Sequence, residues 1–133
     1  MVPPPARILI VDDSLETRDI YADYLSYFGY RVAGAGSAGE AFRVIRGLRP
    51  DVIVIDLSLP GMDGYETTRR LRADPYISGV PIIMLTGHLL KGSEQTALAA
   101  GADAFLTKPC LPEELLKTIE GLLSSPDARA TSA

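Results

Sequence analysis

Five short runs of apolar residues recur at similar intervals along the chain. The third run, from Val52 to Ile55, consists of four β-branched residues in succession, and the others are also rich in Val, Ile and Leu. Uninterrupted apolar runs of this length are typical of strands covered on both faces, as in parallel sheets. The predicted strands span residues 6–11, 30–35, 51–55, 80–85 and 102–106.

Each run is followed by a segment that predicts a helix, in most cases by apolar residues at helical spacing and at residues 93–100 by its alanine content. The first segment starts after Ser14, a residue type that caps helix N-termini, and ends at Gly29, because glycine commonly follows a helix. Its apolar stripe at i, i+3, i+4 and i+7 consists of Tyr21, Tyr24, Leu25 and Phe28. The predicted helices span residues 15–28, 38–48, 65–73, 93–100 and 112–123.

The alternation of strands and helices predicts an α/β fold with one doubly wound, five-stranded parallel sheet and helices on both faces. In such sheets, functional residues gather at the carboxyl ends of the strands. A chain of 133 residues suits one domain. We expect this domain to fill residues 6–123, with a disordered N-terminal extension at 1–5 and a flexible C-terminal tail at 124–133.

Charge and composition exclude several classes of function. The net charge is −4 and no basic stripe is visible, so direct nucleic-acid binding is not expected. Cys110 is the single cysteine, which rules out an internal disulfide and a paired-thiol metal site and suits a reducing cytoplasm. No stretch of about 18 consecutive apolar residues occurs, so membrane spanning is not expected either.

Polar residues follow four of the predicted strands. Asp12 and Asp13 end the first strand, Asp56 ends the third, Thr86 ends the fourth and Lys108 follows the fifth. Clustered carboxylates repel one another unless a hard cation neutralises them, and oxygen ligands favour Mg²⁺. A cation beside a carboxylate nucleophile suits phosphoryl transfer, with Asp56 as the acceptor. The Lys108 amine and the Thr86 hydroxyl would then contact the phosphoryl group.

This set of residues, Asp12-Asp13, Asp56, Thr86 and Lys108-Pro109, resembles the receiver domain of two-component response regulators over residues 6–123. The resemblance implies that a histidine kinase or histidine phosphotransfer protein transfers a phosphoryl group to Asp56. It also implies Mg²⁺ bound by Asp13, Asp56 and the backbone carbonyl of Ser58, with Asp12 acting mainly through water.

The resemblance further implies a flavodoxin-like strand order of 2-1-3-4-5 and a cis peptide bond between Lys108 and Pro109. Thr86 and Phe105 would form a switch pair, although Phe105 taken alone is more simply a core aromatic. A downstream protein partner would then bind the face formed by residues 93–100, 102–106 and 112–123. A phosphorylation-dependent dimer is compatible with the sequence.

Two other classes of protein share parts of this pattern. Phosphatases with an aspartate nucleophile use similar Mg²⁺ chemistry, but their nucleophile usually follows the first strand as Asp-x-Asp, whereas Asp56 is isolated and lies mid-chain. A flavin-binding protein would need a first loop that holds phosphate, which Asp12-Asp13 would repel. Within the receiver family, the short segment after the last helix favours a stand-alone domain over one cut from a larger regulator.

Other conspicuous residues have simpler interpretations. We assign no role to His88, since a lone loop histidine is usually just exposed. Cys110 is interpreted as inert packing. The run Arg69-Arg70-Leu71-Arg72 is interpreted as a solvated helix face.

Overall fold

The computed structural model describes residues 5–87 and 93–124. Most of the predicted terminal extension and tail, together with His88, lies outside these described residues. Within them, five strands alternate with five helices, as the sequence predicts. The strands are β1 (Arg7–Val11), β2 (Arg31–Ala35), β3 (Val52–Asp56), β4 (Ile82–Thr86) and β5 (Ala104–Thr107). The helices are α1 (Leu15–Tyr27), α2 (Ala38–Gly47), α3 (Gly64–Ala73), α4 (Ser93–Ala100) and α5 (Pro112–Ser124).

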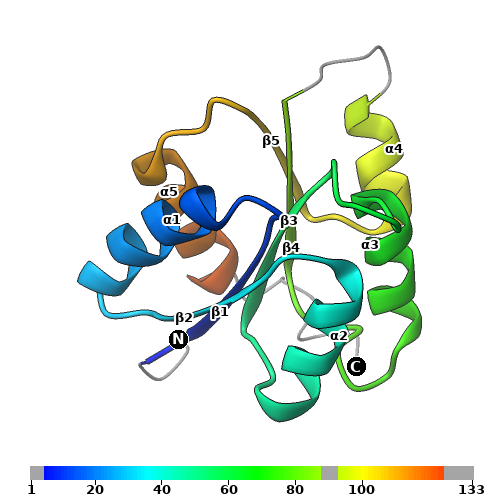
Figure 1. The fold of residues 1–133 in the computed structure, drawn as a ribbon, viewed down its shortest axis with the longest axis horizontal. Helices are drawn as coiled ribbons and strands as arrows, with labels where there is room; N and C mark the ends of the chain where they lie inside the picture. Colours follow the sequence, from blue (N-terminus) through cyan, green and yellow to red (C-terminus); the bar gives the residue numbers. More distant parts are fainter. Residues whose placement is uncertain (1–4, 88–92, 125–133) are drawn as a thin grey trace.

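The strands form one sheet in the order β2-β1-β3-β4-β5, and every neighbouring pair is parallel. Helices α1 and α5 cover one face of the sheet, and α2, α3 and α4 cover the other (Figure 1). This arrangement confirms the predicted fold class and strand order. No helix in the described part of the chain is long and apolar enough to cross a membrane.

The alternation of side chains along each strand gives the sheet a separate apolar core on each face. On the α1 and α5 side, Ile8 and Ile10 pack with Leu25 and Ile119. On the other side, residues of the same central strands pack against α2 and α3. A third and smaller cluster lies beside α4 and has three buried members, Met84, Ala97 and Ala102.

Two strands begin two residues later than predicted. In each case an amide just before the strand donates its hydrogen bond within a backbone turn instead of to a neighbouring strand. The Val80 N–H donates to the Ile77 carbonyl at 3.0 Å, so β4 starts at Ile82. Similarly, the Ala102 N–H donates to the Ala97 carbonyl at 3.0 Å and ends α4, so β5 starts at Ala104. Apolar periodicity does not distinguish such turn residues from strand residues.

Two sequence interpretations are wrong in detail. Phe28 does not join the buried stripe of α1: it is 48% exposed and lies just past the helix end, where its ring contacts those of Tyr24 and Tyr27. The arginine run of α3 is only partly a solvated face. The side chain of Arg69 is 52% exposed, but that of Arg72 is 13% exposed and forms a salt bridge with Asp103.

Candidate functional site

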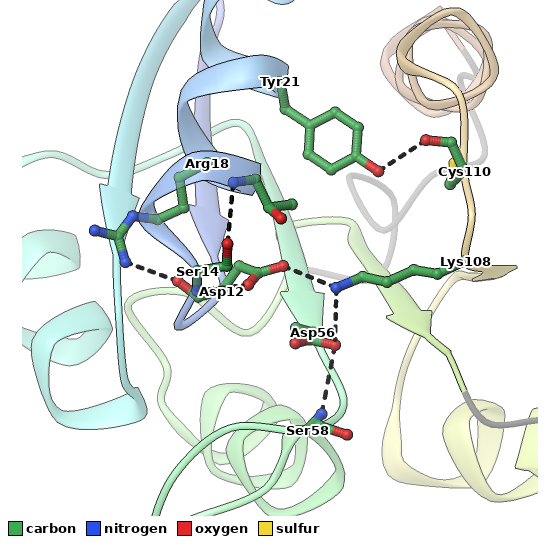
Figure 2. A network of polar contacts seen from close by, with 9 residues as sticks. Asp12, Ser14, Arg18, Tyr21, Asp56, Ser58, Lys108 and Cys110 are labelled. Atoms are coloured by element: carbon green, nitrogen blue, oxygen red, sulfur yellow. Dashed lines mark hydrogen bonds and ion pairs between the residues drawn. The ribbon is translucent and has the colours of Figure 1, made fainter.

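The carboxyl ends of the strands bring the predicted site residues together at one edge of the sheet. Asp12 follows β1 directly, Asp56 is the last residue of β3 and Lys108 follows β5. The Lys108 Nζ lies 3.0 Å from Asp12 Oδ2 and 3.5 Å from Asp56 Oδ1 (Figure 2). Residues separated by up to 96 positions in sequence are therefore in direct contact at this site.

Asp12 is held by the protein through each of its polar groups. Its N–H donates to the Ala35 carbonyl at 2.9 Å, and its own carbonyl accepts from Arg18 Nη1 at 2.7 Å. Its carboxylate accepts from the Ser14 N–H at 2.9 Å and from Lys108 Nζ at 3.0 Å. Since Asp12 is 2% exposed, these bonds compensate the cost of burying its charge. The side chain is thus fixed in orientation.

Asp56 is buried but less firmly bonded than Asp12. It is 6% exposed, and its Oδ1 accepts from the Ser58 N–H at 3.4 Å, a long hydrogen bond. Burial raises the pKa of Asp56 above its ordinary value; the charge of Lys108 opposes this shift, and the Asp12 carboxylate adds to it. Nearby positive charge therefore favours the carboxylate form of Asp56.

Lys108 supplies that charge. Burial by itself lowers the pKa of Lys108, but the hydrogen bond to Asp12 and the charges of Asp56 and Asp12 outweigh burial and raise it overall. The amine is consequently protonated at neutral pH. The peptide bond that follows it, Lys108–Pro109, is cis.

The three predicted acids form a cluster that can hold a cation. One carboxylate oxygen from each of Asp12, Asp13 and Asp56 lies within 4.8 Å of the others. Asp13 is exposed, whereas the other two are buried, so the cluster opens to solvent on the Asp13 side. Hard divalent cations prefer oxygen ligands and often retain water. The donor set therefore fits such a cation.

The end of the loop between β3 and α3 packs against the backbone of Asp56 and Leu57. The Gly64 N–H donates to the Leu57 carbonyl at 2.9 Å, and Asp63 caps α3 by accepting from the Glu66 N–H. A Cβ at position 64 would lie 2.8 Å from both the Asp56 carbonyl oxygen and the Leu57 Cα, so only glycine fits there. This close approach fixes the backbone of Asp56.

Thr86 and Phe105 lie on the neighbouring strands at the same side of the sheet. Thr86 is the last residue of β4 and is fully buried, and its carbonyl accepts from the Lys108 N–H at 2.7 Å. Phe105 on β5 is partly buried and packs against the cluster of Met84, Ala97 and Ala102. Their role as a switch pair stays a prediction.

Two contacts of the site were not identified from the sequence. Arg18 reaches the Asp12 carbonyl, and Tyr21, expected only to face the core, donates its hydroxyl to the Cys110 carbonyl at 2.8 Å (Figure 2). Both acceptors are backbone carbonyls, which residue types do not reveal. The Tyr21 bond connects α1 to the segment that follows Lys108.

The Tyr21 hydroxyl should titrate above the ordinary range of a tyrosine. Burial, followed by the charges of Cys110 and Asp12, raises the pKa of Tyr21 from 10.0 to about 12. A raised pKa in the folded state means that Tyr21 contributes stability below pH 10.0, which is lost as the pH rises toward about 12. When phenolate absorbance is followed during a pH titration, we expect a component near pH 12 that disappears in Tyr21→Phe. An unchanged titration curve in that variant would contradict the assignment.

Comparisons with known proteins agree with this geometry. Residues 8–120 match the family model described as response regulator receiver domain. The chain is 39% identical to the DNA-binding response regulator MtrA of Mycolicibacterium paratuberculosis over 91% of its own length and 52% of the relative's. It is also 39% identical to the phosphate regulon transcriptional regulatory protein PhoB of Pseudomonas aeruginosa, over 87% of this chain and 51% of that protein. The chain thus spans about half the length of these curated relatives.

Solved structures give the same result for the fold. The chemotaxis response regulator CheY4 of Vibrio cholerae superposes with a TM-score of 0.82 at 36% identity, covering 87% of this chain and 97% of that one. A CheY-like response regulator receiver domain protein from Methanospirillum hungatei superposes with a TM-score of 0.84 at 33% identity, covering 96% and 98% of the two chains.

Proposed function

This chain belongs to the family of response regulator receiver domains, and from that premise we propose that Asp56 accepts a phosphoryl group from a histidine kinase or histidine phosphotransfer protein. The observation that supports the proposal is the contact of 3.5 Å between the Lys108 amine and the Asp56 carboxylate, beside two further acids. It combines a nucleophile, a fixed positive charge and a set of oxygen ligands in one site.

The transfer requires Asp56 in its carboxylate form. One carboxylate oxygen attacks the phosphorus of the donor phosphohistidine; a P–O bond forms, the P–N bond breaks, and the imidazole nitrogen keeps the electron pair and takes a proton from solvent. Lys108 favours the carboxylate form by lowering the pKa of Asp56, and its amine can pair with a phosphoryl oxygen. The chain modifies only itself in this scheme and is not an enzyme acting on other substrates.

We propose that Asp13, Asp56 and the backbone carbonyl of Ser58 hold Mg²⁺, with Asp12 acting through water. When bound, the ion would neutralise the acid cluster and the charge of the incoming phosphoryl group. Asp12 can serve in this way because its carboxylate is already fixed by Ser14 and Lys108. Asp13, being exposed, is free to contact the ion directly.

The output would be a change of the surface formed by α4, β5 and α5. The Thr86 hydroxyl would turn toward the phosphoryl oxygens, and the Phe105 ring would move inward behind it. A downstream protein partner in the cytoplasm, or a second copy of the chain, would then bind the changed surface. The net charge of −4 disfavours direct contact with nucleic acid.

Phosphorylation with a small donor tests this function. The protein is incubated with Mg²⁺ and acetyl phosphate, and intact-mass and peptide mass spectrometry locate any labile phosphoryl adduct. We expect one adduct, on Asp56, and none in Asp56→Asn. The matched control is Asp23→Asn, which removes an exposed carboxylate of α1 and should leave the adduct unchanged. A wild-type protein that binds Mg²⁺ but stays unmodified would contradict the proposal.

A further inference from the structure

Arg18 extends from α1 back over the acidic loop. Its Nη1 donates to the Asp12 carbonyl at 2.7 Å (Figure 2). Hydrogen bonds from a charged donor are stronger than neutral ones, and this donor is only partly exposed to water. The contact therefore restrains the backbone at the point where β1 gives way to the acids.

Two glycines at the end of β2 make room for the arginine side chain. A Cβ at Gly34 would lie 3.2 Å from the Arg18 Cδ, and a Cβ at Gly36 would lie 2.9 Å from Nη1. The guanidinium thus lies directly against the backbone of β2. Its position is set from two sides, by the Asp12 carbonyl and by these glycines.

Neutralising an acid does not explain the position of this arginine. Among residues 5–87 and 93–124, no carboxylate lies within ion-pair distance of the Arg18 guanidinium. Its identified acceptor is a backbone carbonyl, and that carbonyl belongs to the peptide group between Asp12 and Asp13. Because a peptide group is planar, fixing the carbonyl direction also fixes the position of the Asp13 Cα.

We propose that Arg18 is a positioning residue that fixes the Asp12–Asp13 peptide group and so directs the Asp13 carboxylate into the cation site. The part of this inference that concerns the cation rests on the proposed function. Groups that orient metal ligands without touching the metal commonly set its affinity. Arg18 would do so through the backbone.

The direction of the change in Mg²⁺ affinity distinguishes a positioning role of Arg18 from a purely electrostatic one. Removing a positive charge beside three acids should tighten Mg²⁺ binding if charge alone matters. We expect the opposite: Arg18→Met should bind Mg²⁺ about tenfold more weakly in isothermal titration calorimetry. Arg18→Lys, which keeps the charge but not the planar group, should weaken binding less. Arg43→Met, at an exposed position of α2, makes the same change in net charge and should bind like the wild type.

A second variant displaces the arginine without altering it. Gly36→Ala places a methyl group 2.9 Å from Nη1, so the guanidinium must shift from the position in which it bonds to the Asp12 carbonyl. It should weaken Mg²⁺ binding in the same direction as Arg18→Met. Gly39→Ala is the matched control, because a Cβ at position 39 meets nothing within 4 Å.

Amide hydrogen exchange in metal-free protein gives a readout independent of the cation. The Asp12 and Ser14 amides should exchange faster in Arg18→Met and Gly36→Ala, but not in the two controls, and by more than the change in global stability of each variant accounts for. Unchanged exchange, or Mg²⁺ binding that is equal or tighter in Arg18→Met, overturns the proposal. If the wild type binds no Mg²⁺, the proposed cation fails, and equal exchange rates would still refute the role of Arg18.

Discussion

Arg72→Met is expected to lower the free energy of unfolding by about 3 kcal/mol, because it breaks a largely buried ion pair and leaves the Asp103 carboxylate without its opposing charge. Arg72 Nη2 lies 2.7 Å from Asp103 Oδ2, and the two side chains are 13% and 19% exposed. The same guanidinium also donates to three backbone carbonyls, those of Ser78, Val80 and Gly101. It therefore connects α3 to the turns that precede β4 and β5.

Urea denaturation monitored by circular dichroism measures this loss. The matched control is Arg69→Met on the same helix, because Arg69 is half exposed and pairs with Glu66 at the surface. Its expected loss of stability is much smaller than that of Arg72→Met, because an exposed ion pair contributes little to stability. Similar losses in the two variants would show that the buried network around Arg72 adds nothing.

Lys108→Met is expected to slow phosphoryl acceptance at Asp56 by about 10²-fold, the usual effect of removing one group that stabilises developing charge. The variant also removes the charge that lowers the pKa of Asp56. With that pKa raised further, the carboxylate form appears only at higher pH, so the acidic limb of the rate profile should move upward in pH.

The rate is measured with acetyl phosphate at saturating Mg²⁺ across a pH series. Lys117→Met is the matched control, since Lys117 is an exposed lysine of α5 and the variant has the same net charge. It should react like the wild type at every pH. A Lys108→Met protein that is folded and equally fast would contradict the role of the amine.

The sequence predicts the fold because the central strands β1, β3 and β4 are buried on both faces. Residues such as Ile53 and Val54 face opposite cores, so the whole run must be apolar and stands out from its surroundings. The site is predictable for a related reason: the apolar runs of β1 and β3 stop abruptly at Asp12 and Asp56, so buried polar groups stand where apolar residues would otherwise continue. Parallel pairing then brings those ends to one edge.

The remaining contacts could not be predicted in the same way. Arg18 and Arg72 act mainly on backbone carbonyls, and every residue has a carbonyl, so no spacing of residue types marks the acceptor. The only hint of these contacts in the sequence is the presence of glycines at the positions where the two arginine side chains pack against the backbone. A Cβ at Gly101 would lie 2.6 Å from the Arg72 Cγ, just as one at Gly36 would meet Arg18.

The unequal sizes of the three apolar clusters have a consequence for α4. This helix packs on the smallest cluster, where two of the three buried residues are alanines. Its C-terminal end is held by the bond of 2.8 Å from Arg72 to Gly101, whereas the Tyr65 hydroxyl reaches Ser93 at its other end over 3.5 Å. Because little apolar area is buried in this cluster, its burial contributes less to holding α4 in place than the two larger clusters contribute to the other helices.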